Sequence, residues 1–73
     1  MRDWNAYAKA ILRFEMTRRQ ITAAELARLL GEIGIEDNER NVGNKIARGT
    51  FSAAFFLQCL AAMKVSNLHL DEA

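Results

Sequence analysis

Two consecutive segments of this chain each carry a start and a stop signal for a helix, and only a short turn separates them. Thr22-Ala23-Ala24-Glu25 has the capping-box pattern, in which a threonine caps the helix and a glutamate follows three residues later. Gly34 is placed to end that helix, because glycine readily adopts the left-handed backbone of a helix stop. The second segment begins at Asp37 or Asn38 and ends at Gly49. We therefore expect helices over about residues 22–33 and 38–48.

The rest of the chain also favours helices. Proline is absent and β-branched residues are sparse, while Ala, Leu, Arg and Glu are common. Asp3 caps a first helix over about residues 3–19, and Ser52 caps a fourth over about residues 52–64. We expect one all-α domain of four or five helices spanning residues 1–73. The tail from residue 65 alternates apolar and polar residues, so a short C-terminal strand and an extended tail are both compatible with it.

Apolar spacing predicts which face of each helix is buried. In the second helix the inner side is expected to hold Leu26, Leu29, Leu30 and Ile33. In the first helix Lys9 and Arg13 lie opposite an expected apolar stripe of Trp4, Tyr7, Ala8, Ile11 and Phe14. The fourth helix is apolar almost all round, with a main stripe of Phe56, Cys59, Leu60 and Met63. Phe55 points off that stripe, which leaves it for a second contact surface.

Composition excludes several classes of protein. A chain of 73 residues has a small core, so a partner subunit is a reasonable expectation. One cysteine, Cys59, and one histidine, His69, cannot form a zinc site or a disulfide framework. No phosphate loop, nucleophile elbow, membrane span or signal peptide is visible, so we expect no enzyme activity, cofactor, small-molecule substrate or membrane attachment. A lone cysteine fits a cytoplasmic setting.

The segment from Asp37 to Gly49 has a basic and amide-rich face. At about 100° per residue, one arc of roughly 140° contains Arg40, Asn41, Asn44, Lys45 and Arg48. Val42 and Ile46 point the other way. Arg, Lys and Asn are the side chains that contact phosphates and read purine edges in the DNA major groove. The face predicts a recognition helix for double-stranded DNA, although the net charge of the chain is only +1.

Other interpretations of these residues stay open. A basic, amide-rich helix face is common on ordinary solvated surfaces. Arg48 can serve only to satisfy the last carbonyls of its helix. Phe51, Phe55 and Phe56 are typical of a core or an interface. The alternative functions are a protein-interaction module without DNA binding and an antitoxin-like partner of another protein.

Sequence motifs add a resemblance to known families. Glu25-Leu26-Ala27-Arg28-Leu29-Leu30-Gly31 resembles the second helix, E-L-A-x-x-L-G, of phage-repressor (Cro/C1, XRE-type) domains. Ile46-Ala47-Arg48-Gly49 and the segment from Phe56 to Val65 are similar to the end of those domains. From Glu39 to Phe55 the chain resembles E-R-N-x-x-N-K-I-x-R-G-x-F-S-A-A-F, the hallmark of a family of small bacterial domains of unknown function, DUF6471. The resemblance covers about Leu12 to Leu70.

The resemblance implies a lambda-repressor-like helix-turn-helix fold and a cytoplasmic, homodimeric transcriptional regulator. Its third helix is expected in the major groove, with an exposed face of Arg40, Asn41, Asn44 and Lys45. Residues expected near phosphates are Arg18, Arg19, Thr22 and Arg48. Residues expected at the dimer interface are Trp4, Tyr7, Phe55, Leu68 and Leu70. The stretch between Gly31 and Ile46 is longer than in a typical repressor, so the turn or the second helix must absorb about three to six extra residues.

Overall fold

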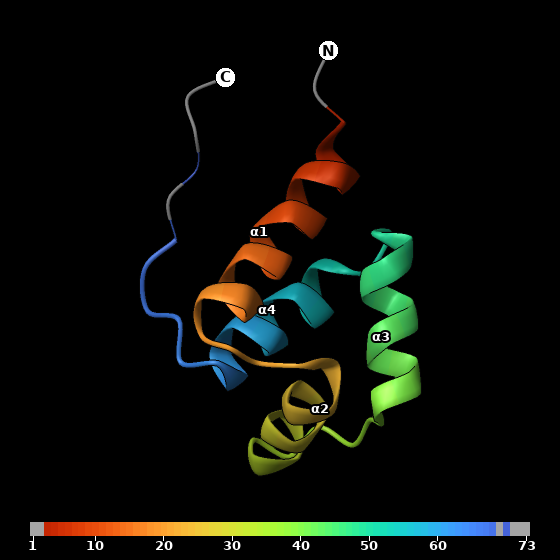
Figure 1. Ribbon diagram of the computed structural model, residues 1–73, viewed down its shortest axis with the longest axis vertical. Helices are drawn as coiled ribbons and strands as arrows, with labels where there is room; N and C mark the ends of the chain where they lie inside the picture. The colour runs from red at the N-terminus through yellow and green to blue at the C-terminus, as the bar shows by residue number, and fades with distance from the viewer. Residues whose placement is uncertain (1–2, 69, 71–73) are drawn as a thin grey trace.

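The computed structural model describes residues 3–68 and residue 70, and this part of the chain contains four α-helices (Figure 1). They are α1 (Trp4–Arg18), α2 (Ala23–Glu32), α3 (Glu39–Arg48) and α4 (Ala53–Ala62). The expectation of an all-α structure is confirmed. A strand within Ser66–Leu70 is not formed in the described residues, because Ser66, Asn67, Leu68 and Leu70 have no regular structure. His69 and residues 71–73 lie outside the described part.

Each helix begins at a side-chain cap that the sequence predicts. An oxygen of the capping side chain accepts a hydrogen bond from the backbone N–H three residues later, at 2.8–3.2 Å. The four caps are Asp3, Thr22, Asn38 and Ser52. Of the two candidates for α3, Asn38 is therefore the cap and Asp37 is available for another role. Gly49 ends α3 with a φ of 71°, and Gly34, with a φ of 86°, follows the end of α2.

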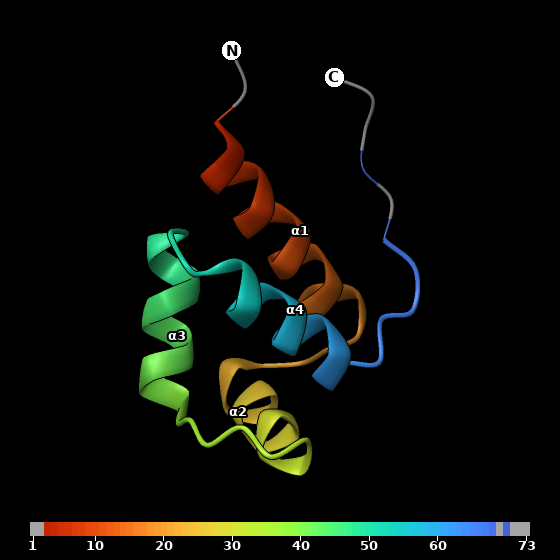
Figure 2. The same cartoon turned by 180° about the vertical axis from the view of Figure 1, so that it is seen from behind.

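The helices form a small bundle in which α2 packs against α3 and α4, and α1 packs against the same two helices. Figures 1 and 2 show α3 along one side of the bundle and the C-terminal tail on the other side, beside α1. Lys9 fastens α1 to the end of α3, because its Nζ donates a hydrogen bond to the carbonyl of Ala47 at 2.8 Å. The prediction that Lys9 lies opposite the packed face of α1 is wrong for this reason.

The core lies where the four helices meet. Five side chains have no exposed surface, namely Leu12, Leu26, Leu30, Val42 and Cys59. Around them lie the nearly buried Ile46, Phe55, Leu60, Ala62 and Met63. Burial raises the pKa of the Cys59 thiol to about 12, so the thiol is an inert core group.

Two predicted apolar stripes differ from the buried faces. In α1 the buried residues are Leu12 and Glu15, whereas Trp4 and Phe14 are 63% and 61% exposed. The reason is that α1 is apolar on two sides, and its aliphatic side faces α3 and α4.

In α4, Phe55 is buried beside Phe51, with ring centroids 5.7 Å apart, and Leu57 is the exposed residue. The expected place of Phe55 at a dimer interface is therefore wrong. Ile33, expected on the inner side of α2, is about half exposed where the helix ends. Each difference reflects how the helices dock, which local spacing does not fix.

No helix among the described residues is long and apolar enough to cross a lipid bilayer.

Candidate nucleic-acid interface

The outer side of α3 presents a polar face built from four exposed side chains, Arg40, Asn41, Asn44 and Arg48. Val42 and Ile46 anchor the opposite side of the helix in the core. The face contains an open depression lined by Asn41, Asn44, Lys45, Ala47 and Arg48. Its amides and guanidinium groups supply the donors and acceptors that pair with phosphates and base edges.

Both arginines of this face are available for a ligand. Within the described residues, the guanidinium groups of Arg40 and Arg48 form no ion pair with a carboxylate and no hydrogen bond with a protein acceptor. An arginine carries five N–H donors in a planar fork, which matches a phosphate or the O6/N7 edge of guanine. The two ends of α3 therefore each present a full positive charge to solvent.

Lys45 departs from the prediction. Its Nζ lies 2.8 Å from Oδ2 of Asp37 and 4.8 Å from the centroid of the Phe55 ring. Lys45, which was expected on the exposed DNA-binding face, therefore has an acid as its partner. The hydrogen bond from Lys45 is the main cause that lowers the pKa of Asp37, and the backbone N–H of Asn38 and the side chain of Asn41 lower it further. The presence of Asp37 in the sequence could have indicated this pair. Because Asn38 caps the helix, the Asp37 side chain can pair with Lys45.

Arg18 and Arg19, predicted to meet phosphates, lie elsewhere. Arg19 Nε is 3.2 Å from Oε1 of the buried Glu15, and its Nη1 donates to the carbonyl of Met63 at 3.4 Å. Arg18 lies 3.9 Å from the same carboxylate and stands over the Phe14 ring, on the side of α1 that faces the tail. Both arginines thus belong to the packing of α1 rather than to the α3 face.

Arg13 is a basic residue beside α3 that sequence reasoning did not select. With Thr17, it lines an open groove that also includes Ala23, Gly43 and Ala47. This groove joins α1 and the start of α2 to the α3 face, because Ala47 borders both depressions. Thr22, the remaining predicted phosphate contact, caps α2 at this end. The signal for Arg13 was its position on the polar side of the first helix.

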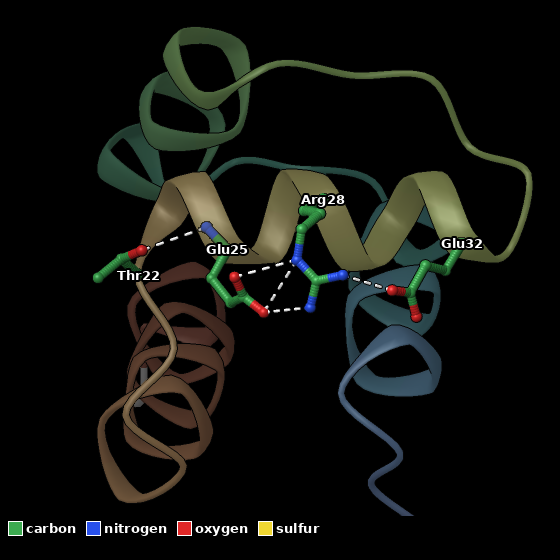
Figure 3. Close-up of polar contacts among 4 residues, drawn as sticks. All are labelled: Thr22, Glu25, Arg28 and Glu32. Carbon is green, nitrogen blue, oxygen red and sulfur yellow. Dashed lines mark hydrogen bonds and ion pairs between the residues drawn. The ribbon is translucent and has the colours of Figure 1, made fainter.

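The outer face of α2 is acidic rather than basic (Figure 3). Arg28 lies between Glu25 and Glu32, with its Nε 3.2 Å from both carboxylate oxygens of Glu25 and its Nη1 on Glu32. Arg28 lowers the pKa of Glu25 through this hydrogen bond. The carboxylate of Glu25 thus turns to Arg28, and only the Thr22 half of the predicted capping box is formed as expected. Two carboxylates around one guanidinium leave this face with excess negative charge.

The C-terminal tail runs beside α1, on the other side of the bundle from α3 (Figure 2). Several exposed apolar side chains lie on α1 and the tail. Between α1 and the tail lies a depression lined by the apolar Ile11, Phe14 and Leu68 and also by polar residues, namely Glu15, Arg18 and Asn67. The Trp4 and Tyr7 rings meet edge to face with centroids 6.0 Å apart, and Leu70 is exposed. Of the five predicted dimer residues, four therefore lie on α1 or the tail.

A search of the described residues finds no cluster of His, Cys, Asp and Glu side chains that could hold a metal ion. Comparisons with curated proteins and with solved structures gave no significant match. The family model for a domain of unknown function (DUF6471) matches residues 4–68, which include all four helices and the α3 face. The chain therefore belongs to the DUF6471 family of domains of unknown function.

Proposed function

We propose that this protein binds double-stranded DNA in a sequence-dependent manner and regulates transcription, with α3 entering the major groove. The observation that carries the proposal is the outer face of α3. There Arg40 and Arg48, both without a carboxylate partner in the described chain, flank the exposed amides of Asn41 and Asn44. Arginine paired with guanine and asparagine paired with adenine are common direct contacts in that groove.

The position of α3 supports this role. The helix has ten residues, so it is about 15 Å long, and it lies along one side of the bundle where a duplex can approach (Figure 1). Arg13, Thr17 and Thr22 border the face from α1 and from the start of α2. We assign them to the phosphate backbone and the polar face of α3 to the bases. A homodimer formed through the apolar surface of α1 and the tail would leave both copies of α3 uncovered.

The test is binding to a mixed pool of duplex DNA, measured by fluorescence anisotropy from low to moderate salt. We expect affinity to fall as salt rises, because cations that neutralise phosphates displace counterions. Arg40→Gln combined with Asn44→Ala should weaken binding at least tenfold. Lys64→Asn is the matched control, because Lys64 is an exposed cation at the end of α4, where the tail begins, and asparagine tolerates its positive φ. Salt-independent binding, or equal affinity of the two variants, would refute the proposal.

A protein-interaction module without DNA binding is the second candidate. The exposed aromatic rings of Trp4 and Phe14 and the excess acid around Arg28 favour it, since neither surface suits a polyanion. The same titration separates the two functions. An interaction module would bind no duplex at any salt concentration, and its substitutions at Arg40 and Asn44 would have no effect on partner binding.

A further inference from the structure

We propose that Asp37 is a positioning residue that withholds Lys45 from the DNA-facing surface of α3. The inference rests on the proposed function and deepens it, because it states which cations of the face contact phosphate. The four exposed polar residues of α3 then remain to contact DNA. Lys45, the fifth residue of the predicted face, is paired with Asp37 instead.

Lys45 is within reach of the face but its charge is directed elsewhere. On a helical wheel it is about 40° from Asn41, and its side chain helps to line the depression on the α3 face. Its ammonium group, however, lies on the Asp37 carboxylate at 2.8 Å. The lysine stem is flexible and ends in a point charge, so a new position for its end requires no movement of the helix.

Two contacts, with Asp37 and with Phe55, hold the ammonium in this position, and a backbone hydrogen bond fixes the Asp37 side chain. The Asp37 side chain is only 7% exposed, and its Oδ1 accepts a hydrogen bond from the N–H of Asn38 at 2.9 Å. The carboxylate is therefore fixed where α3 begins. The Phe55 ring lies below the ammonium at 4.8 Å and adds a cation–π attraction. Lys45 keeps 38% of its side chain exposed, so solvent and a nearby phosphate can reach it once Asp37 is neutral.

If Asp37 keeps Lys45 from DNA, neutralising Asp37 should change the salt dependence of DNA binding by a measurable amount. Each cation that neutralises a phosphate of B-DNA contributes about 0.9 to the slope of log affinity against log salt concentration. The Asp37→Asn substitution removes the competing charge with little change of shape, so Lys45 becomes free to contact a phosphate. We expect the slope to steepen by about 0.9 in this variant.

The experiment compares the salt slopes of the wild-type protein, Asp37→Asn, Lys45→Gln and the double variant. Asp37→Asn should steepen the slope, and adding Lys45→Gln should restore the wild-type value. Lys45→Gln alone should leave the slope unchanged. The control Glu39→Gln removes an equal charge from an exposed position in the first turn of α3, so it should change affinity without changing the slope. Circular dichroism confirms that each variant is folded.

The outcomes separate this inference from the proposed function. DNA binding by the wild-type protein with equal slopes for Asp37→Asn and the wild type overturns the inference alone. A slope that falls by about 0.9 in Lys45→Gln also overturns it, even if Asp37→Asn does not fold, because Lys45 would already contact DNA. No binding by any variant overturns both proposals. Binding by Asp37→Asn alone supports the inference and overturns DNA binding by the wild-type protein.

Discussion

Replacing Arg19 with alanine should lower the free energy of unfolding by about 2 kcal/mol and leave the salt slope of DNA binding unchanged. The reason is the place of Arg19 in the fold. Its guanidinium pairs with the carboxylate of Glu15 and donates to the carbonyl of Met63, and so joins the end of α1 to the end of α4. It lies apart from the residues that line the two depressions at α3.

The expected loss of unfolding free energy follows from how far the Glu15–Arg19 ion pair is exposed to solvent. Breaking a fully buried ion pair by removing one partner costs about 3–5 kcal/mol, because the other charge is left buried. The Glu15 side chain is 8% exposed, but that of Arg19 is 32% exposed, and Arg18 remains 3.9 Å from the carboxylate. Solvent and Arg18 therefore offset part of the loss, which gives about 2 kcal/mol. For a domain of this size the melting temperature should fall by about 8–16 °C.

Arg13→Ala is the matched comparison, because Arg13 is an exposed arginine of the same helix. Urea unfolding of the two variants, followed by circular dichroism, should show a loss for Arg19→Ala and a change within about 0.5 kcal/mol for Arg13→Ala. The salt slope should show the reverse, with a decrease of about 0.9 only in Arg13→Ala. If Arg19→Ala is as stable as Arg13→Ala, the buried pair does not stabilise the fold and this reasoning is wrong.

Three other predictions test the fold and the assembly. Gly49→Ala should destabilise the protein by about 1–2 kcal/mol in thermal melts, because the φ of 71° strains an L-residue and the new Cβ lies 3.2 Å from a Lys9 carbon; an unchanged melting temperature would contradict this. The lowered pKa of Asp37 stabilises the fold above pH ~4, and this contribution is lost as pH falls through the folded-state pKa. Asp37→Asn should thus be less stable than the wild type at pH 7, and the gap should close in acid urea titrations. Leu68→Asp should shift the mass measured by light scattering from dimer to monomer, while Leu57→Asp, on α4, should not; equal masses for both would exclude the α1 and tail surface.

Local sequence signals predicted the helices well because helix starts are decided within one turn. A cap such as Ser52 needs only the backbone N–H three residues later, and that partner is always present. The glycine stop at Gly49 is equally local, since it depends on one φ angle. The buried side of α3 also followed from spacing, because its apolar residues, Val42 and Ile46, lie on one side only.

Spacing could not predict which of two apolar sides a helix buries. Trp4 and Phe14 have larger apolar side chains than Leu12, yet Leu12 is the residue that reaches the core. Docking against α3 and α4 decides this, and those contacts join segments far apart in the chain. The same limit explains Phe55, which is buried where it packs against Phe51 and the ammonium group of Lys45.

Which acid pairs with which basic side chain was the least predictable part of the site. This pairing also explains how a nearly neutral chain can present a basic surface. Nine acids almost balance ten basic residues in the sequence, which argues against a DNA-binding protein if charges are only counted. The fold, however, pairs particular charges: Glu15 holds Arg19, and Asp37 holds Lys45.

On α2, two acids surround the single Arg28, so negative charge is concentrated on that face. Within the described residues none of these four acids pairs with Arg40 or Arg48, whose side chains are exposed at the surface of α3. A phosphate within about 10 Å, the screening distance at moderate salt, responds to those two arginines rather than to the net charge of the protein. The measurable consequence is that the cations bordering α3 set the slope of log DNA affinity against log salt concentration. This slope cannot be calculated from the composition alone.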